Sequence, residues 1–334
     1  MRKVVLTGDR PSGNLHIGHY IGSLAERVRM QESGNYEIYI LIADLQALAS
    51  VNESEKVKAM VEEIVLDYLA VGLNPDKVHF VLQSAVPALY ELPMYYMNLV
   101  TQARLERNPT VKTEIKSKKL NKEIPVGFVN HPISQAADIT AFGAHVVPVG
   151  ADQAPMLEQT REIVATFNRM YGETLVMPEA KIPAKEKSRL VGTDGNGKMS
   201  KSLGNCIYIK DSEATLRQKV RDMYTDPNHI KITDPGKVEG NVVFAYLDAF
   251  CADKKLVSEL KAQYRKGGLG DVKIKTMLAD ILNDLLSPMR ERRAQYEKHP
   301  EAVREFIKSG TNVAIAKTNE TLYKVRKAIG IYQI

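Results

Sequence analysis

The sequence predicts an α/β protein, with a doubly wound parallel sheet followed by an all-helical C-terminal part. Short apolar segments alternate with helical ones over residues 3–150, the order that is typical of βαβ units. Polar residues follow directly after several of the apolar segments, where open α/β sheets bind their ligands. From residue 211 onward the pattern is helical, so we expect no further strand there.

The first unit is a strand at residues 3–6, a tight turn, and a helix that starts after Asn14. Gly8, Pro11 and Gly13 interrupt the apolar pattern, as expected of a tight connection. The apolar residues of the helix recur at helical spacing: Ile17, Ile21, Leu24 and Val28. The turn therefore presents a helix N-terminus, whose N–H groups and dipole favour phosphate.

Two histidines, His16 and His19, share one face of the first helical turn. Gly18 lies between them and carries no Cβ, so a planar ring could approach the backbone there. A metal site is one interpretation, but no third ligand lies nearby and the spacing of catalytic zinc sites is absent. We therefore favour imidazoles that donate to phosphate oxygens as charge develops on them.

Further strands are expected at residues 37–43, 78–82 and 145–150, and further helices at 53–71, 89–105 and 133–142. Asp44 and Gln46 follow the first of these strands, and Asp152 and Gln153 follow the last. Asp152 either accepts from a ribose hydroxyl or caps the next helix, and capping does not exclude binding. Asp138 lies among small and apolar neighbours, so its charge must be paired, exposed or used.

The segment 191–205 is rich in glycine and holds Lys198 and Lys201, separated by Met-Ser. An ordinary turn is one interpretation. A mobile cation clamp that delivers positive charge to a leaving pyrophosphate is the other, and the glycines favour it.

The C-terminal part is expected to hold helices at residues 213–223, 242–252, 254–265, 271–298 and 316–329. It also holds the whole basic excess of the chain, which has a net charge of +6. Residues 1–204 contain 23 Lys/Arg and 23 Asp/Glu, whereas residues 205–334 contain 23 and 17. A solvated helical surface could have this composition by chance, but a polyphosphate partner is expected to leave such a footprint.

The composition bounds the class of protein. Cys206 and Cys251 are the only cysteines, too few for a disulfide framework or a four-thiolate metal site. The N-terminus has no signal-peptide pattern, and no apolar run reaches the roughly twenty residues of a membrane span. We expect a cytoplasmic enzyme without a zinc or iron–sulfur site, and without a membrane or DNA partner.

Two motifs in this order resemble the signatures of class I aminoacyl-tRNA synthetases. The first is His16-Ile17-Gly18-His19 and the second is Lys198-Met199-Ser200-Lys201-Ser202. Over essentially the whole chain, the likeness is greatest to the bacterial tryptophanyl-tRNA synthetases. Further segments that carry it are GDRPSG (8–13), LERNPTVKTE (105–114), QAADI (135–139), PVGADQ (148–153), TREI (160–163), PEAKIP (178–183) and GGLGDVK (267–273).

The resemblance implies a Rossmann-like catalytic domain over 1–204 and a helical, basic, tRNA anticodon-binding domain over 205–334. Within the first, 107–130 is expected to be a mobile, solvated insertion, in which Lys112 is the candidate to close over ATP phosphates. The segment 191–205 is the second-signature loop. The implied partners are ATP, with Mg²⁺ bound through its phosphates, L-tryptophan and tRNA(Trp), and the implied assembly is a homodimer.

The resemblance also implies roles for single residues. Asp138 would accept the indole N–H of tryptophan, beside Gln135, His131 and Gln153. His16, His19, Lys198 and Lys201 would stabilise charge on the phosphates during adenylate formation. The residues expected to contact ATP are Arg10, Pro11, Ser12, Gly18, His19, Gly150, Ala151, Asp152, Leu190, Lys198, Met199, Ser200, Lys201 and Ser202.

Three positions depart from the common pattern of that family. Arg10 stands where Gln is common, His131 where Tyr is frequent, and Gln135 where Met is frequent. The spacing from Gln135 to Asp138 also resembles the tyrosyl-tRNA synthetases, so a tyrosine enzyme stays open as a second hypothesis. A nucleotidyltransferase that shares only the first motif is a third. A catalytically silent paralogue that binds RNA or tryptophan is a fourth, although it would be expected to lose His16, His19 or Lys198.

Overall fold

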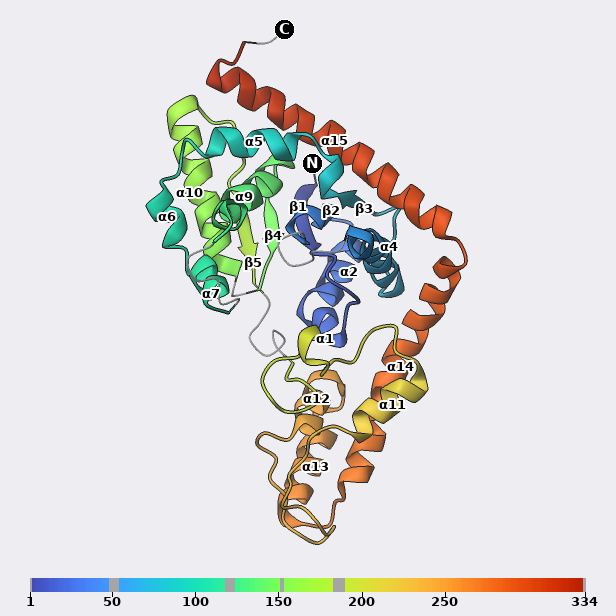
Figure 1. Ribbon diagram of the computed structural model, residues 1–334. Helices are drawn as coiled ribbons and strands as arrows, with labels where there is room; N and C mark the ends of the chain where they lie inside the picture. Colours follow the sequence, from blue (N-terminus) through green and yellow to red (C-terminus); the bar gives the residue numbers. More distant parts are fainter. Residues whose placement is uncertain (1, 48–53, 118–123, 151–152, 183–189, 333–334) are drawn as a thin grey trace.

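The computed structural model describes residues 2–47, 54–117, 124–150, 153–182 and 190–332 (Figure 1). Its centre is a five-stranded sheet in the order β3-β2-β1-β4-β5, and every neighbouring pair is parallel. This is the strand order of a doubly wound sheet, and it confirms the predicted α/β class. The strands are β1 (Lys3–Asp9), β2 (Tyr36–Ile42), β3 (Val78–Leu82), β4 (Val146–Pro148) and β5 (Glu179–Lys181).

Helices cover both faces of the sheet, because the central strands bury side chains on both sides. Val5, Ile38 and Phe80 belong to one apolar cluster, and Leu6, Tyr39 and Val81 belong to another, as period-two alternation requires. The helices of this part are α1 (Ile17–His19), α2 (Ala25–Glu32), α3 (Asp44–Ala47), α4 (Ser54–Ala70), α5 (Ala88–Tyr96), α6 (Gln102–Glu106), α7 (Pro109–Ser117), α8 (Val126–Val129), α9 (His131–Ala141) and α10 (Ala154–Tyr171).

The regular elements of the C-terminal part are all helices in the described residues, with a long non-helical segment at 222–241, and most of this part forms a lobe below the sheet in Figure 1. Its helices are α11 (Glu213–Arg221), α12 (Val242–Phe250), α13 (Lys254–Lys266), α14 (Asp271–Glu297) and α15 (Pro300–Ile329). Helix α14 leaves the lobe and packs on α4, and α15 then runs back along β3. No helix in the described part of the chain has the length and apolar character needed to cross a bilayer.

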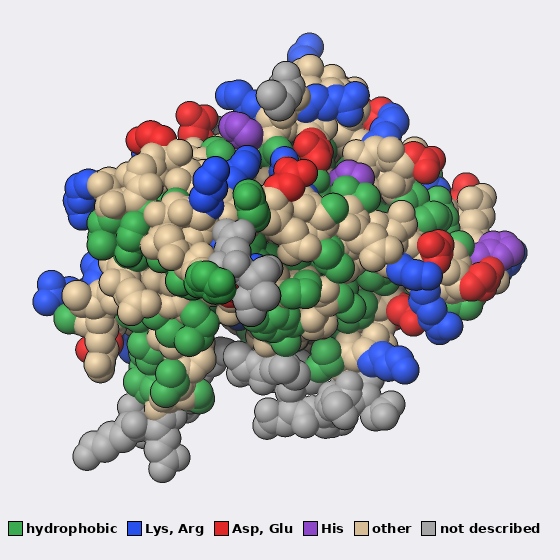
Figure 2. All heavy atoms as spheres, turned by 90° about the horizontal axis from the view of Figure 1, so that it is seen from above, with side chains coloured by type: hydrophobic (Ala, Val, Ile, Leu, Met, Phe, Trp, Pro, Cys, Tyr) green, Lys and Arg blue, Asp and Glu red, His purple; other side chains and the backbone are tan. Residues whose placement is uncertain are grey.

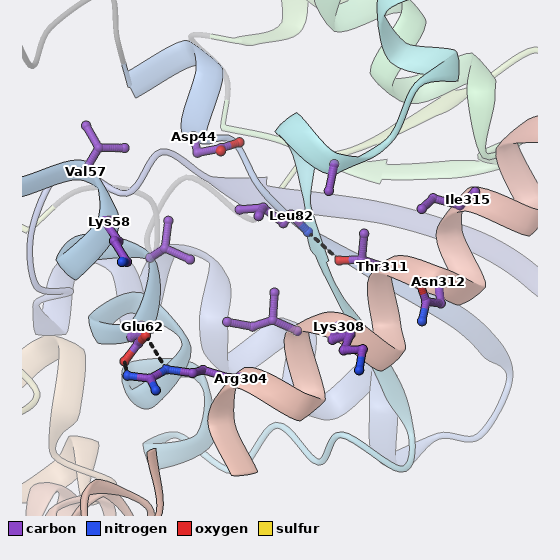
Figure 3. A pocket seen from close by; sticks show the side chains of 13 residues that line it. Asp44, Val57, Lys58, Glu62, Leu82, Arg304, Lys308, Thr311, Asn312 and Ile315 are labelled. Carbon is purple, nitrogen blue, oxygen red and sulfur yellow. Dashed lines mark hydrogen bonds and ion pairs between the residues drawn. The ribbon is translucent and has the colours of Figure 1, made fainter. Parts of the chain in front are cut away.

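Helix α15 begins at Pro300, whereas the sequence predicts a helix only from residue 316. Gly310 interrupts the helical pattern in the sequence, but the structure uses it for close packing. A Cβ at Gly310 would lie 2.4 Å from the carbonyl oxygen of Phe80 on β3. Next to it, the hydroxyl of Thr311 accepts the N–H of Leu82 at 3.0 Å (Figure 3). The glycine therefore lets the helix reach the edge of the sheet.

Other elements also differ from prediction. Strand β1 continues through Gly8 to Asp9, whereas the sequence predicted a strand at residues 3–6 and placed Gly8 in the turn; the glycine instead allows close approach to Leu41 on β2. The single helix expected over 89–105 is two helices, α5 and α6, and Thr101 caps the second through its side chain. The helix after β1 contains a π-helical turn, η1 (Tyr20–Leu24). Strand β5 was not predicted, because its three side chains are all exposed and carry no apolar alternation.

The segment 107–130 contains helices α7 and α8 in its described part. Lys112 is exposed on α7, and Lys118, Lys119 and Lys122 lie outside the described residues. Val111 on α7 is buried, so this helix is anchored to the body of the protein.

Candidate active site

The turn after β1 places two imidazoles at the start of a helix. His16 is the N-cap of α1, and its ring centroid lies 3.8 Å from that of His19. The backbone N–H of His16 donates to Nδ1 of His19 at 3.2 Å. This bond makes Nδ1 an acceptor, so the proton of a neutral His19 is assigned to Nε2.

Both imidazoles are neutral at physiological pH. Burial, followed by the charges of His19 and Lys201, lowers the pKa of His16 to about 3. Burial also lowers the pKa of His19 to about 4, against the opposing effect of Asp9. The pair can therefore offer N–H donors but carries no net positive charge.

The ammonium group of Lys201 lies at this turn. It donates to the carbonyl oxygen of Gly13 at 2.7 Å and lies 3.5 Å from the hydroxyl of Ser12. Burial lowers its pKa. The two motifs thus meet in space, although 188 positions separate Gly13 from Lys201.

The rest of the loop is held by short-range contacts. Residues Val191 and Lys198 form an isolated antiparallel bridge, and the N–H of Met199 donates to the carbonyl of Leu190 at 3.0 Å. Met199 and Leu190 are buried in the core, whereas Lys198 and Ser202 are exposed. Ser200 donates its N–H to the side chain of Asn205 at 2.8 Å.

Gly18 is required by the crowding of this turn. A Cβ at Gly18 would lie 2.8 Å from Nδ1 of His16 and 3.4 Å from the sulfur of Met199. Any side chain would therefore push the His16 ring or the loop out of place. This close approach explains the glycine inside the first motif.

A cavity of about 500 Å³ opens between the turn and the carboxyl ends of β1, β2 and β4. Its lining includes Gln46, which follows β2, and eight of the residues expected to bind ATP or tryptophan: Arg10, Gly18, His19, His131, Gln135, Asp138, Gly150 and Gln153. Pro11, Ser12, His16, Leu190 and residues 198–202 are not part of that lining, and neither is Lys112. Ala151 and Asp152 lie outside the described residues.

Asp138 is buried at the inner end of the cavity, on α9. Nε2 of Gln83 donates to its two oxygens at 2.9 and 3.0 Å, and Nε2 of Gln46 donates to Oδ2 at 3.1 Å. Burial raises the pKa of Asp138 to about 7, although both amides favour the charged form. An ionised carboxylate offers about four lone-pair sites, so the group retains acceptor capacity toward the cavity.

Other polar groups surround Asp138. Oε1 of Gln135 is buried and has no hydrogen-bond partner among the described residues. Nη2 of Arg10 lies 3.2 Å from Nε2 of His131, which joins two of the positions that depart from the family pattern. The cavity thus has acceptors at its inner end and a guanidinium on its wall.

A polar cluster at the carboxyl end of β1 was missed by the sequence analysis, although Asp9 and Arg27 both line the cavity. Arg27 donates to Oδ2 of Asp9 at 2.6 Å, and the hydroxyl of Tyr68 donates to the same oxygen at 2.8 Å. Arg27 is 3% exposed. The basic neighbours, above all Arg27, keep the pKa of Asp9 below its ordinary value despite the opposing effect of burial. Asp9 lies at the carboxyl end of β1, which is the signal that could have found it.

Gln83 was also missed, although the same signal applies to it. It follows strand β3 directly, as Asp44 and Gln46 follow β2. A polar residue at the carboxyl end of β1, β2 or β3 therefore indicated a residue at or next to the candidate site.

A second cavity, of about 670 Å³, lies between α4 and α15 (Figure 3). Its lining is largely apolar, with Val57, Leu82 and Ile315 among its members. None of the motif residues lines it, so the smaller cavity is the candidate active site.

Comparison with known proteins agrees with this assignment. The family described as tRNA synthetases class I (W and Y) matches residues 2–287. The tryptophan–tRNA ligase of Clostridium longisporum is 55% identical over 332 residues, covering 99% of this chain and 97% of that protein. That of Lactococcus lactis is 54% identical, covering 99% and 98%. The fold and the site therefore define a class I tRNA synthetase of the W and Y family.

Solved structures narrow the assignment from the W and Y family to the tryptophanyl-tRNA synthetases. The tryptophanyl-tRNA synthetase of Campylobacter jejuni, complexed with ADP and tryptophan, has a TM-score of 0.85 and 32% identity. The alignment covers 98% of this chain and 100% of that one. The chain belongs to the bacterial tryptophanyl-tRNA synthetases.

Proposed function

We propose that the protein is a tryptophan–tRNA ligase and that the 500 Å³ cavity is its active site. The carboxylate of tryptophan attacks the α-phosphorus of ATP and forms tryptophanyl-adenylate with release of pyrophosphate. A ribose hydroxyl of the 3′-terminal adenosine of tRNA(Trp), the 2′ one in class I, then takes the acyl group. The observation that carries this proposal is the contact of Lys201 with the turn that bears His16 and His19.

Stabilisation of phosphate charge is divided between two kinds of group. Neutral His16 and His19 supply N–H donors at the helix N-terminus, where the dipole also favours an anion. Lys198 and Lys201 supply the net positive charge, and Mg²⁺ enters with the ATP phosphates. No protein group acts as a nucleophile, so catalysis consists of positioning and electrostatic stabilisation.

Further residues contact ATP in this proposal. Arg10, Gly18 and Gly150 reach it from the cavity wall, and Ala151 and Asp152 follow Gly150 in the sequence. Pro11 and Ser12 belong to the turn beneath Lys201. Leu190, Met199, Ser200 and Ser202 belong to the loop that closes on the phosphates.

Tryptophan is recognised at the inner end of the cavity. Asp138 accepts the indole N–H, and Gln83 and Gln46 orient its carboxylate. Gln135, His131 and Gln153 line the space around it. A site built around such a hydrogen bond can reject an analogue without the N–H by a factor of roughly 10⁴.

The helical residues 205–334 are proposed to bind the tRNA, since they hold the whole basic excess of the chain. We place the boundary between the catalytic part and this part near residue 204. The last helix of this part, α15, nevertheless packs on β3 of the catalytic sheet. Basic and acidic side chains are interspersed on the face seen in Figure 2, which lies away from the lobe.

A homodimer is proposed through the apolar surface of α5. Tyr90 and Met94 are 46% and 60% exposed, and Met97 directly after the helix is 39% exposed. Adjacent large apolar side chains on one helix are typical of a buried interface.

The proposed activity is tested by ATP–pyrophosphate exchange with each of the twenty amino acids. Exchange that depends on tryptophan alone supports the proposal, and exchange with tyrosine or with none of them contradicts it. The chain contains no Trp, so the fluorescence of bound substrate can be read without a protein indole background.

A further inference from the structure

Both backbone polar groups of Leu15, the residue just before the first motif, are held by hydrogen bonds. The N–H of Leu15 donates to Oδ2 of Asp67 on α4 at 2.7 Å. Its carbonyl oxygen accepts the N–H of Ile209 at 3.0 Å. The next residue is His16, so these two bonds fix the backbone from which the imidazole projects.

Asp67 is fully buried and is held from a distant part of the chain. Nη1 of Arg293, on α14, donates to Oδ1 of Asp67 at 2.7 Å. The same guanidinium reaches Glu63 through Nη2 at 2.7 Å and Glu297 through Nε at 2.8 Å. All three guanidinium nitrogens are engaged, and Arg293 is itself 3% exposed. Its orientation is therefore set by three carboxylates.

The second bond to Leu15 also leads to α14. The segment that contains Ile209 continues to Asp211, whose carboxylate accepts the N–H of Tyr208 at 2.8 Å. The guanidinium of Arg290 lies 3.4 Å from the carbonyl oxygen of Asp211. Arg290 and Arg293 are three residues apart and share a face of α14. One helix thus supports both the N–H side and the C=O side of the Leu15 backbone.

We propose that Asp67 and Arg293 are positioning residues, which transmit the placement of α14 to the turn that carries His16. This inference rests on the proposed function. Helix α14 also packs against α11 and α12, so the lobe proposed to bind tRNA and the turn proposed to bind ATP are tied to one helix. Neither residue lines the active-site cavity, and their effect on the reaction passes through Leu15.

The electrostatics explain why the pair must act together. Burial raises the pKa of Asp67 to about 6, even though Arg293 favours its charged form. Loss of the guanidinium would raise this pKa further and so favour the protonated carboxyl. A protonated carboxyl is a weaker acceptor for the Leu15 N–H than a carboxylate is. Loss of Arg293 should therefore loosen the turn without removing any group from the cavity.

We call the link from Arg293 through Asp67 to the Leu15 backbone the relay. Arg293→Met tests it, and Arg293→Lys is a milder variant that keeps a cation but has fewer directed donors. The matched control is Arg304→Met, which removes the pair of Arg304 with Glu62 between α15 and the same helix α4 (Figure 3). The first measurement is the hydrogen-exchange rate of the Leu15 amide. The second is kcat and KM for tryptophan in ATP–pyrophosphate exchange.

For Arg293→Met we expect Leu15 exchange to rise at least tenfold and kcat to fall at least tenfold, with KM for tryptophan changed less than twofold. Arg293→Lys should give intermediate values, and Arg304→Met should match the wild type. An unchanged Leu15 exchange rate in Arg293→Met, or in Arg293→Lys if the first variant does not fold, overturns the relay. So does an equal loss of kcat in the control. If the wild type showed no tryptophan-dependent exchange, the proposed function would fail, and the Leu15 amide would still decide the relay.

Discussion

The ammonium of Lys201 donates to the carbonyl oxygen of Gly13 at 2.7 Å, which joins the second motif to the turn before the first. A half-buried cation held by a neutral carbonyl retains donors for another acceptor, since an ammonium has three N–H bonds. This contact therefore places positive charge beside the helix N-terminus before any phosphate arrives.

Removal of that charge should slow the chemical step. We expect Lys201→Met to lower kcat for tryptophan-dependent pyrophosphate exchange by about 10²-fold, the usual effect of losing one electrostatic donor. KM for tryptophan should change little, because Lys201 does not line the cavity. Lys266→Met, at an exposed position on α13, is the control. A change confined to tryptophan affinity would show that Lys201 does not act on the phosphates.

Gly18→Ala should disturb the first motif by sterics alone. The new Cβ would meet the His16 ring at 2.8 Å, so the ring or the loop at Met199 must shift. We expect kcat to fall by about tenfold or more, since misplacement of a positioned donor by 1 Å can cost 10²-fold. Gly127→Ala is the comparison, because no heavy atom lies within 4 Å of its Cβ. Equal activity in both variants would mean that the crowding at Gly18 is irrelevant to catalysis.

Much of the fold followed from periodicity. Strand β3 has the predicted bounds, and β2 and β4 differ from prediction only near their ends, whereas β1 continues through Gly8 to Asp9, beyond its predicted end. The features that were missed depend on tertiary contacts. Gly310 interrupts the helical pattern in the sequence but allows α15 to approach Phe80, and β5 has no apolar pattern because all of its side chains are exposed.

For the candidate site, the sequence indicated several of the residues but not the partners that hold them in place. The first motif indicated the turn at His16, and a charge among small and apolar neighbours, together with the family resemblance, indicated Asp138. The partners of those residues were not predictable, because Gln83 lies 55 positions from Asp138 and Arg293 lies 226 positions from Asp67. A buried charge in a sequence implies that a partner exists, but only the packing of helices identifies it.

Tryptophan recognition should depend on the ionisation of Asp138. Its pKa is about 7 in the free protein, and the indole N–H is best accepted by the charged form. KM for tryptophan is therefore expected to be constant above pH 8 and to rise by up to tenfold per unit as the pH falls below 7. Binding should lower this pKa, because the new hydrogen bond favours the carboxylate.

Asp138→Asn isolates that effect. We expect KM for tryptophan to increase at least tenfold at pH 8, with the dependence on pH removed and KM for ATP within twofold. Discrimination against a benzothiophene analogue of tryptophan, which lacks the N–H, should also fall sharply. An unaltered KM profile in Asp138→Asn would place the indole acceptor on another residue.

Arg27→Met should destabilise the protein through Asp9 rather than through lost packing. The variant leaves the Asp9 carboxylate, which is 19% exposed, with only the hydroxyl of Tyr68 as a side-chain donor among the described residues, and leaving a group without its partner costs about 1–3 kcal/mol. The double variant Asp9→Asn with Arg27→Met removes the uncompensated charge, so it should recover much of that loss. Urea unfolding of the two variants and the wild type measures the difference. If the double variant were as unstable as Arg27→Met, the loss would come from the volume of the arginine side chain and not from the charge that it balances.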